Sequence, residues 1–97
     1  MQTFVTNYGK KFKDDKGNPQ LPDALAALAY DATNMLLQSI QKTGVDDPVK
    51  VKDVMASSTF DAVSGHITFD AFHTPIKTVT IVHVTGGKAQ YFSQIQP

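Results

Sequence analysis

The sequence predicts an α/β chain made of three helices, one strand and a final β-hairpin. Apolar residues recur at helical spacing as far as about residue 57, and from His66 onward they alternate with polar residues as in a half-buried strand. Gly86 and Gly87 then separate two runs rich in β-branched and aromatic residues, which is the pattern of a hairpin.

The first helix is expected over residues 3–13. Phe4, Tyr8 and Phe12 recur every four residues, so they share one helical face and indicate packing on a core. Residues 14–19, which include two aspartates, a glycine and a proline, end the helix as a turn.

The second helix gives the strongest helical pattern. Pro22 and Asp23 mark its start, an apolar stripe runs from Leu25 to Ile40, and Gly44 suits the position after its end. The four alanines of residues 24–29 make its first turns slim, which permits close packing of another backbone or of a ligand.

The third helix is expected to begin at Pro48, with Asp47 as its N-cap residue. Val51, Val54 and Met55 form its apolar side, and the polar residues 57–59 end it. It is therefore a short helix with one buried face.

Strands follow the third helix. Ile67 and Phe69 alternate with polar neighbours in the strand expected over residues 66–70, and residues 71–75 are expected to form a loop. Residues 76–84 and 88–95 form the two arms of the expected hairpin. The order of elements is then helix, helix, helix, strand, hairpin.

Composition sets limits on function. The chain has 97 residues, 41% of them hydrophobic, and nine lysines balance nine aspartates. With zero net charge and no arginine, it has no electrostatic footprint for nucleic acid. Residues 1–7 do not resemble a signal peptide, and no run of about 20 apolar residues could cross a bilayer.

No catalytic or metal-binding pattern is present, so neither an enzyme nor a cofactor is expected. His66, His73 and His83 lack the spacing of metal ligands, and there is no cysteine. Gly86-Gly87 joins two strands, not a strand and a helix, so it does not fit a phosphate-binding loop.

Four stretches resemble the branched-chain amino-acid (Leu/Ile/Val) ABC transporter substrate-binding protein family. Residues 27–32, ALAYDA, resemble its alanine-flanked Tyr-Asp-Ala signature, and residues 60–70, FDAVSGHITFD, resemble its Phe-x-Gly-Val-Thr-Gly-x-x-x-Phe-Asp stretch. The aromatic helix at the start and the ending from Pro75 to Lys88 also match in order and spacing. Ala62 and Ser64 depart from the family's usual glycine and threonine.

The resemblance implies the carboxy-terminal segment of a type I periplasmic-binding-protein fold, in which two lobes close on a ligand. It places residues 1–17 and 75–97 in lobe two and residues 18–70 in lobe one. A hinge is then expected at about 70–75, with Asp70, Ala71 and Thr74 as its residues. A plain loop within one compact sheet is the alternative interpretation.

For function, the resemblance implies an extracytoplasmic solute-binding component of an ABC importer, which binds branched-chain or other small amino acids and delivers them to a membrane permease. It places most head-group contacts upstream of this chain, and it implies that a signal or lipoprotein leader lies outside it. Within the chain, Leu25 is the one candidate ligand contact, as an apolar wall; an ordinary core position is the alternative.

Two other classes of function compete with transport. One is an enzyme, such as a hydrolase on another α/β frame, which the missing catalytic pattern disfavours. The other is a small protein-interaction or regulatory ligand-sensing domain of the same fold. Apolar helix faces and open strand edges also predict that the chain associates with itself.

Overall fold

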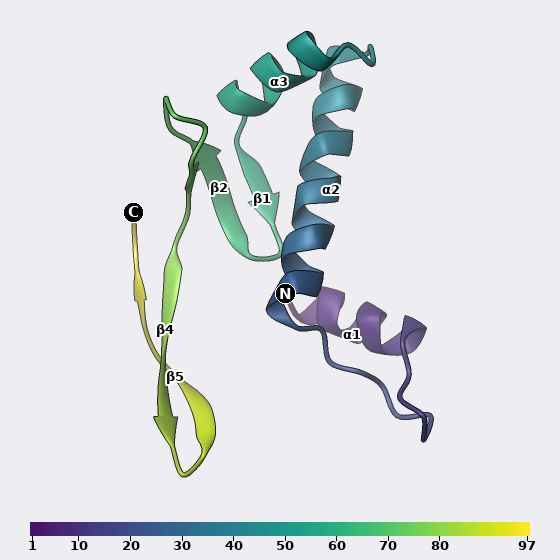
Figure 1. Ribbon diagram of the computed structural model, residues 1–97, viewed down its shortest axis with the longest axis vertical. Coiled ribbons are helices and arrows are strands. Elements are labelled where there is room, and N and C mark those ends of the chain that lie inside the picture. Colours follow the sequence, from purple (N-terminus) through teal and green to yellow (C-terminus); the bar gives the residue numbers. More distant parts are fainter.

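The computed structural model describes residues 1–97 as three helices and five strands (Figure 1). In chain order these are α1 (Gln2–Lys11), α2 (Ala24–Thr43), α3 (Pro48–Ser57), β1 (Phe60–Ala62), β2 (Gly65–Phe69), β3 (Pro75–Ile76), β4 (Val79–Thr85) and β5 (Lys88–Ile95). The expected α/β class, with helices first and a hairpin last, is confirmed. None of the helices is both long enough and apolar enough to span a membrane.

Helix α2 begins and ends where its capping residues predict. The Asp23 carboxylate accepts a hydrogen bond from the Ala26 N–H at 2.7 Å, which satisfies one of the free donors of the first turn. At the other end Gly44 has φ of 72°, a left-handed conformation that favours glycine, and its N–H donates to the Ile40 carbonyl.

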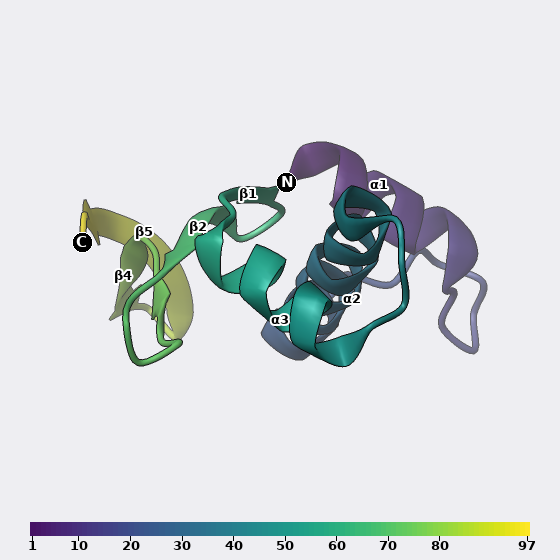
Figure 2. The ribbon, with the colours of Figure 1, turned by 90° about the horizontal axis from the view of Figure 1, so that it is seen from above.

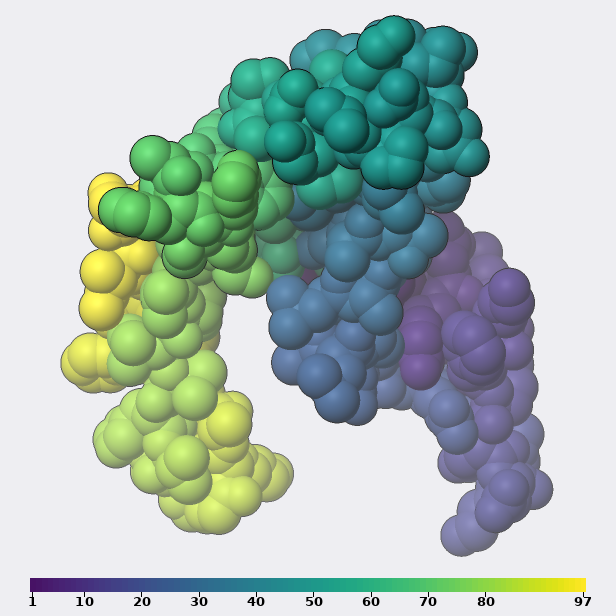
Figure 3. Space-filling view, turned by 45° about the horizontal axis from the view of Figure 1, so that its top comes forward, coloured from purple at the N-terminus to yellow at the C-terminus, as the bar shows by residue number.

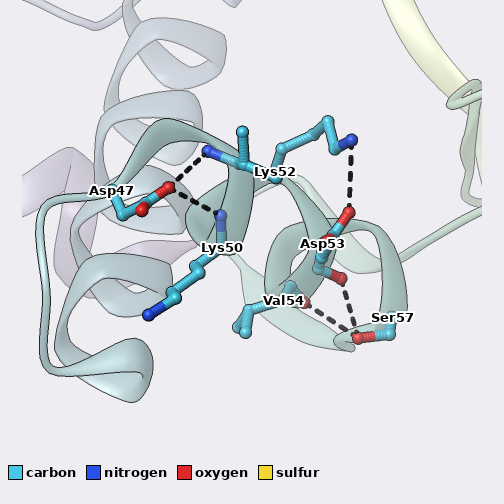
Figure 4. A network of polar contacts seen from close by, with 7 residues as sticks. Asp47, Lys50, Lys52, Asp53, Val54 and Ser57 are labelled. Carbon is cyan, nitrogen blue, oxygen red and sulfur yellow. Dashed lines mark hydrogen bonds and ion pairs between the residues drawn. The ribbon is translucent and has the colours of Figure 1, made fainter.

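Helix α3 has the cap that its sequence predicts. Asp47 accepts hydrogen bonds from the N–H groups of Val49 and Lys50 (Figure 4). Pro48 occupies the first turn, where its missing N–H is not needed. In the last turn the Ser57 hydroxyl donates to the backbone carbonyls of Asp53 and Val54. These bonds hold a helix of ten residues that has little buried surface of its own.

Helix α1 contacts α2 through aromatic rings, as its four-residue period predicts. The ring of Phe4 packs at a tilt against Tyr30 of α2, with 4.9 Å between ring centroids, and Tyr8 lies between Phe4 and Phe12. Gly9 is buried, and a side chain there would meet Pro19 at 2.9 Å. The helix ends at Lys11, two residues earlier than expected, because the chain turns at Phe12 and pairs Lys13 with Pro19.

Strands β1, β2 and β3 form a small antiparallel sheet in that order. Phe60 pairs with Ile67, and Phe69 pairs with Pro75. Strand β1 was not expected, and the expected long strand over residues 76–84 is interrupted at 77–78, so that its first residue belongs to β3 and the rest to β4. Pro75, expected in a loop, lies in β3.

The core is small and lies between α2 and this sheet. Met35 of α2, Phe60 of β1 and Ile67 of β2 are its buried hydrophobic residues, and Met55 and Phe69 pack against them. Phe60 and Phe69 meet edge to face at 6.4 Å. Only 8 of the 97 residues are buried, so most apolar side chains of the chain remain exposed.

The hairpin β4–β5 stands apart from everything else. Its strands pair with each other from Val79–Ile95 to Thr85–Lys88, and neither strand has a Cα within 8 Å of a helix (Figure 2). The hairpin and the helices lie on opposite sides of β2 (Figures 1 and 2). Strand β4 does not pair with β2, but Ile76, the first residue of the strand expected over residues 76–84, pairs with Thr68 of β2 as part of β3, so the hinge stays a prediction.

Candidate functional site

The expected ligand-wall residue, Leu25, lies in the first turn of α2. Within this chain Leu25 is 74% exposed and lies outside the small core of Met35, Phe60 and Ile67. The Asp23 cap fixes the first turn of the helix that carries it. Leu25 is therefore free to contact a ligand or another part of a larger protein, and its role in binding remains a prediction.

The expected hinge residues lie in a tight turn that links β2 to β3. One oxygen of the Asp70 carboxylate accepts the N–H groups of Phe72 at 2.8 Å and Thr74 at 2.9 Å. The Asp70 N–H donates to the Thr74 carbonyl, and the His73 N–H donates to the Asp70 carbonyl. Ala71 lies inside this turn, which is closed by side-chain and backbone bonds together.

His73 completes the turn in a left-handed conformation, with φ of 63°. A non-glycine residue adopts this region only when the surrounding bonds hold it there. The carboxylate of Asp70, which accepts the N–H groups on both sides of His73, supplies that restraint. The turn is therefore a defined structure, not a loose connection.

A buried carboxylate that the sequence analysis did not single out joins α2 to the turn between β1 and β2. Asp31 is 4% exposed, and its two oxygens accept the N–H groups of Val63 and Ser64 at 2.8 and 2.9 Å. These donors lie more than 30 residues away along the chain. The signature Tyr30-Asp31-Ala32 could have indicated this contact from the sequence. It places an aspartate in the middle of a helix, and a buried aspartate needs hydrogen-bond partners.

Next to Asp31 lies an apolar groove between α2 and β2. Its walls are Leu28, Ala32, Met35, Met55, Ile67 and Phe69, and its volume is about 340 Å³. Asp31, Ser64, Pro75 and Lys77 complete its lining, and the Ser64 hydroxyl is buried without a hydrogen-bond partner. We call this the α2–β2 groove.

The titratable groups outside this region are arranged singly or in exposed pairs. His66 and Asp61 approach to 2.9 Å across the β1–β2 ladder, with both side chains largely exposed. No three histidine or aspartate side chains gather closely enough to hold a metal ion. On the exposed hairpin the Thr85 hydroxyl lies 3.3 Å from Nδ1 of His83.

The comparisons with known proteins agree with this architecture. The sequence profile of the family described as periplasmic binding protein matches residues 1–89. The leucine-binding protein LivK from Thermotoga maritima is 32% identical, with a TM-score of 0.78, over 99% of this chain and 26% of its own. No curated protein is detectably similar in sequence.

A second solved structure supports the fold. The solute-binding protein of an ABC transporter from R. palustris, solved in complex with benzoate, has a TM-score of 0.78 at 23% identity and again covers 99% of this chain and 26% of its own. The chain thus spans about a quarter of the length of both proteins. Their fold contains this arrangement of helices, small sheet and hairpin, as the sequence resemblance implied. The chain belongs to the periplasmic binding protein family.

Proposed function

We propose that the protein carrying this chain is the extracytoplasmic solute-binding component of an ABC importer, and that it binds a branched-chain or other small amino acid. The observation that carries the proposal is the 32% identity with a leucine-binding protein over 99% of the chain. The ligand would lie in a cleft between two lobes, and a membrane permease would receive it.

Three features of the structure support a binding role. The hairpin has no Cα within 8 Å of α2 or α3, as expected for segments of two lobes, although α1, also expected in lobe two, contacts Tyr30 of α2. Leu25 exposes an aliphatic side chain, and each methylene group of a ligand buried against it would contribute about 0.8 kcal/mol. The carboxylates of Asp23, Asp31 and Asp70 each accept backbone N–H groups, which fixes the start of α2 and the turns before and after β2.

The test is calorimetry of the complete binding protein with leucine, isoleucine, valine and benzoate. We expect an amino acid to bind at micromolar concentration, and at 100 times its Kd to stabilise the fold by about 2.7 kcal/mol. Tight binding of benzoate and of no amino acid would overturn the ligand class and keep the solute-binding role. Binding of none of these ligands would leave the proposal without support and count against it.

A further inference from the structure

Asp31 is the buried residue of α2 that lies nearest to the start of the helix. It is 4% exposed, and its two carboxylate oxygens accept the N–H groups of Val63 and Ser64 in the turn between β1 and β2. The other aspartates that accept backbone N–H groups take them from residues at most four positions away along the chain. Asp31 therefore attaches a helix to the sheet, whereas the others close a turn or cap a helix.

The two bonds of Asp31 fix the direction of α2 as well as its distance from the sheet. The Val63 nitrogen lies 2.8 Å from one carboxylate oxygen, and the Ser64 nitrogen lies 2.9 Å from the other. One bond would leave the carboxylate free to turn about it, whereas two bonds from neighbouring residues hold its plane. The nearby contact between the Phe4 and Tyr30 rings is apolar and non-directional, so it resists a small rotation of α2 less than these bonds do.

Leu25, the candidate ligand wall, lies on the same helix six residues before Asp31, or about 9 Å along the helix axis. The helix is continuous between them, and the Asp23 cap fixes its first turn. A rotation of α2 by about 10° about Asp31 would therefore displace Leu25 by about 1.5 Å. Binding groups must be held to within about 0.5 Å, so the displacement is large enough to matter. In Figure 3 the first turns of α2, in blue, border the hollow between the helices and the hairpin.

We propose that Asp31 is a positioning residue for ligand binding: its two bonds to the β1–β2 turn set the direction of α2 and thereby hold Leu25 against the side chain of the bound amino acid. This proposal rests on the proposed function and on the role of Leu25 as an apolar wall. Asp31 does not touch the ligand itself, because its side chain is buried and both of its oxygens already accept hydrogen bonds.

A positioning role differs from a purely structural one in what the loss of Asp31 does to binding. If the bonds of Asp31 only stabilise the fold, a variant that is still folded binds its ligand with an unchanged Kd. If they position Leu25, the folded variant binds more weakly, and it does so only while Leu25 is present. The effects of changing Asp31 and Leu25 are then not additive.

The test is calorimetry of leucine binding by the complete binding protein, at a temperature at which circular dichroism shows every variant to be folded. We expect Asp31→Asn to raise the Kd for leucine by about 3- to 30-fold. Asp61→Asn makes the same chemical change at an exposed aspartate, and Val51→Ala removes buried methyl groups from α3 and lowers stability. Both controls should leave Kd within about twofold of the parent value.

A double-mutant cycle completes the test. In the Leu25→Ala background, Asp31→Asn should change Kd by less than about twofold, because the side chain that Asp31 positions has been removed. Equal effects of Asp31→Asn in both backgrounds would overturn the proposal, and so would an equal rise of Kd in Val51→Ala, which would trace the effect to lost stability. Leucine binding that Asp31→Asn or Leu25→Ala leaves unchanged would overturn this proposal alone, whereas a complete protein that binds no amino acid would overturn the proposed function with it.

Discussion

Replacing Asp31 by asparagine removes the one carboxylate that ties α2 to the β1–β2 turn. Asparagine keeps the size of the side chain and one acceptor oxygen, but it puts an amide NH2 where the second oxygen accepts the N–H of Val63 or Ser64. One buried N–H then loses its partner, and the other bond loses its charge. Each bond to a charged group contributes about 1.5–3 kcal/mol, so we expect Asp31→Asn to lower the free energy of unfolding by about 3 kcal/mol.

The assay is urea unfolding followed by far-ultraviolet circular dichroism, at one fixed protein concentration so that any association of copies contributes equally for each variant. Asp61→Asn is the matched control: Asp61 is an exposed aspartate on β1 that pairs only with exposed His66, and its loss should change stability by less than about 0.5 kcal/mol. If Asp31→Asn and Asp61→Asn have equal effects, the buried bonds of Asp31 do not hold the turn and the reasoning is refuted.

Four further predictions concern Leu25, ligand binding by the isolated chain, the Asp70 turn and the Asp14 carboxyl group. In the complete binding protein, Leu25→Ala should weaken leucine binding by about 2 kcal/mol, or roughly 30-fold, while Leu37→Ala on the same helix leaves Kd unchanged; equal Kd values for both variants would exclude Leu25 as a wall. The isolated 97-residue chain should bind leucine weakly or not at all by calorimetry, and micromolar binding would show that the head-group contacts lie within it. Asp70→Ala should speed hydrogen exchange at the Thr74 N–H at least tenfold, and unchanged exchange would mean that the backbone bonds alone close the turn. Backbone and side-chain hydrogen bonds from Asn18 hold the pKa of Asp14 below its ordinary value, so its folded-state contribution is present at higher pH and is lost as pH falls through the lowered pKa; a carbon-13 titration of the carboxyl group at or above the ordinary pKa would contradict this.

The helices could be predicted from the sequence because their signals are local. Asp23, Asp47 and Gly44 each act within four residues of where they stand, and all three end or begin helices as expected. The Gly86-Gly87 turn is equally local, and β5 has the predicted bounds. The end of α1 differs from the prediction. The helix stops at Lys11, two residues early, where the chain turns and Lys13 pairs with Pro19.

The features that the sequence did not reveal depend on distant partners. The segment Phe60–Ala62 alternates apolar, polar and apolar, but three residues are too few to indicate a strand, and it becomes β1 because it pairs with β2. Asp31 has the same residue type as the exposed aspartates of the turns, and only the fold shows that Val63 and Ser64 are its partners. Leu25 and the hinge residues came from family resemblance, and their places in the structure are compatible with the expected roles without testing them.

The carboxylates that hold the turns before and after β2 also indicate where a movement between lobes would occur. Asp31 holds the turn before the strand, and Asp70 holds the turn after it, each by accepting two backbone N–H groups. A rotation at Ala71 must open the bonds of that second turn, whereas Lys77 takes part in no hydrogen bond and lies just before the independent hairpin. Because a local opening that breaks fewer bonds costs less free energy, rotation at Lys77 is cheaper than rotation within 70–74. Movement within the expected hinge range therefore requires that the Asp70 turn opens, and the exchange rate of the Thr74 N–H in the liganded and free protein measures whether it does.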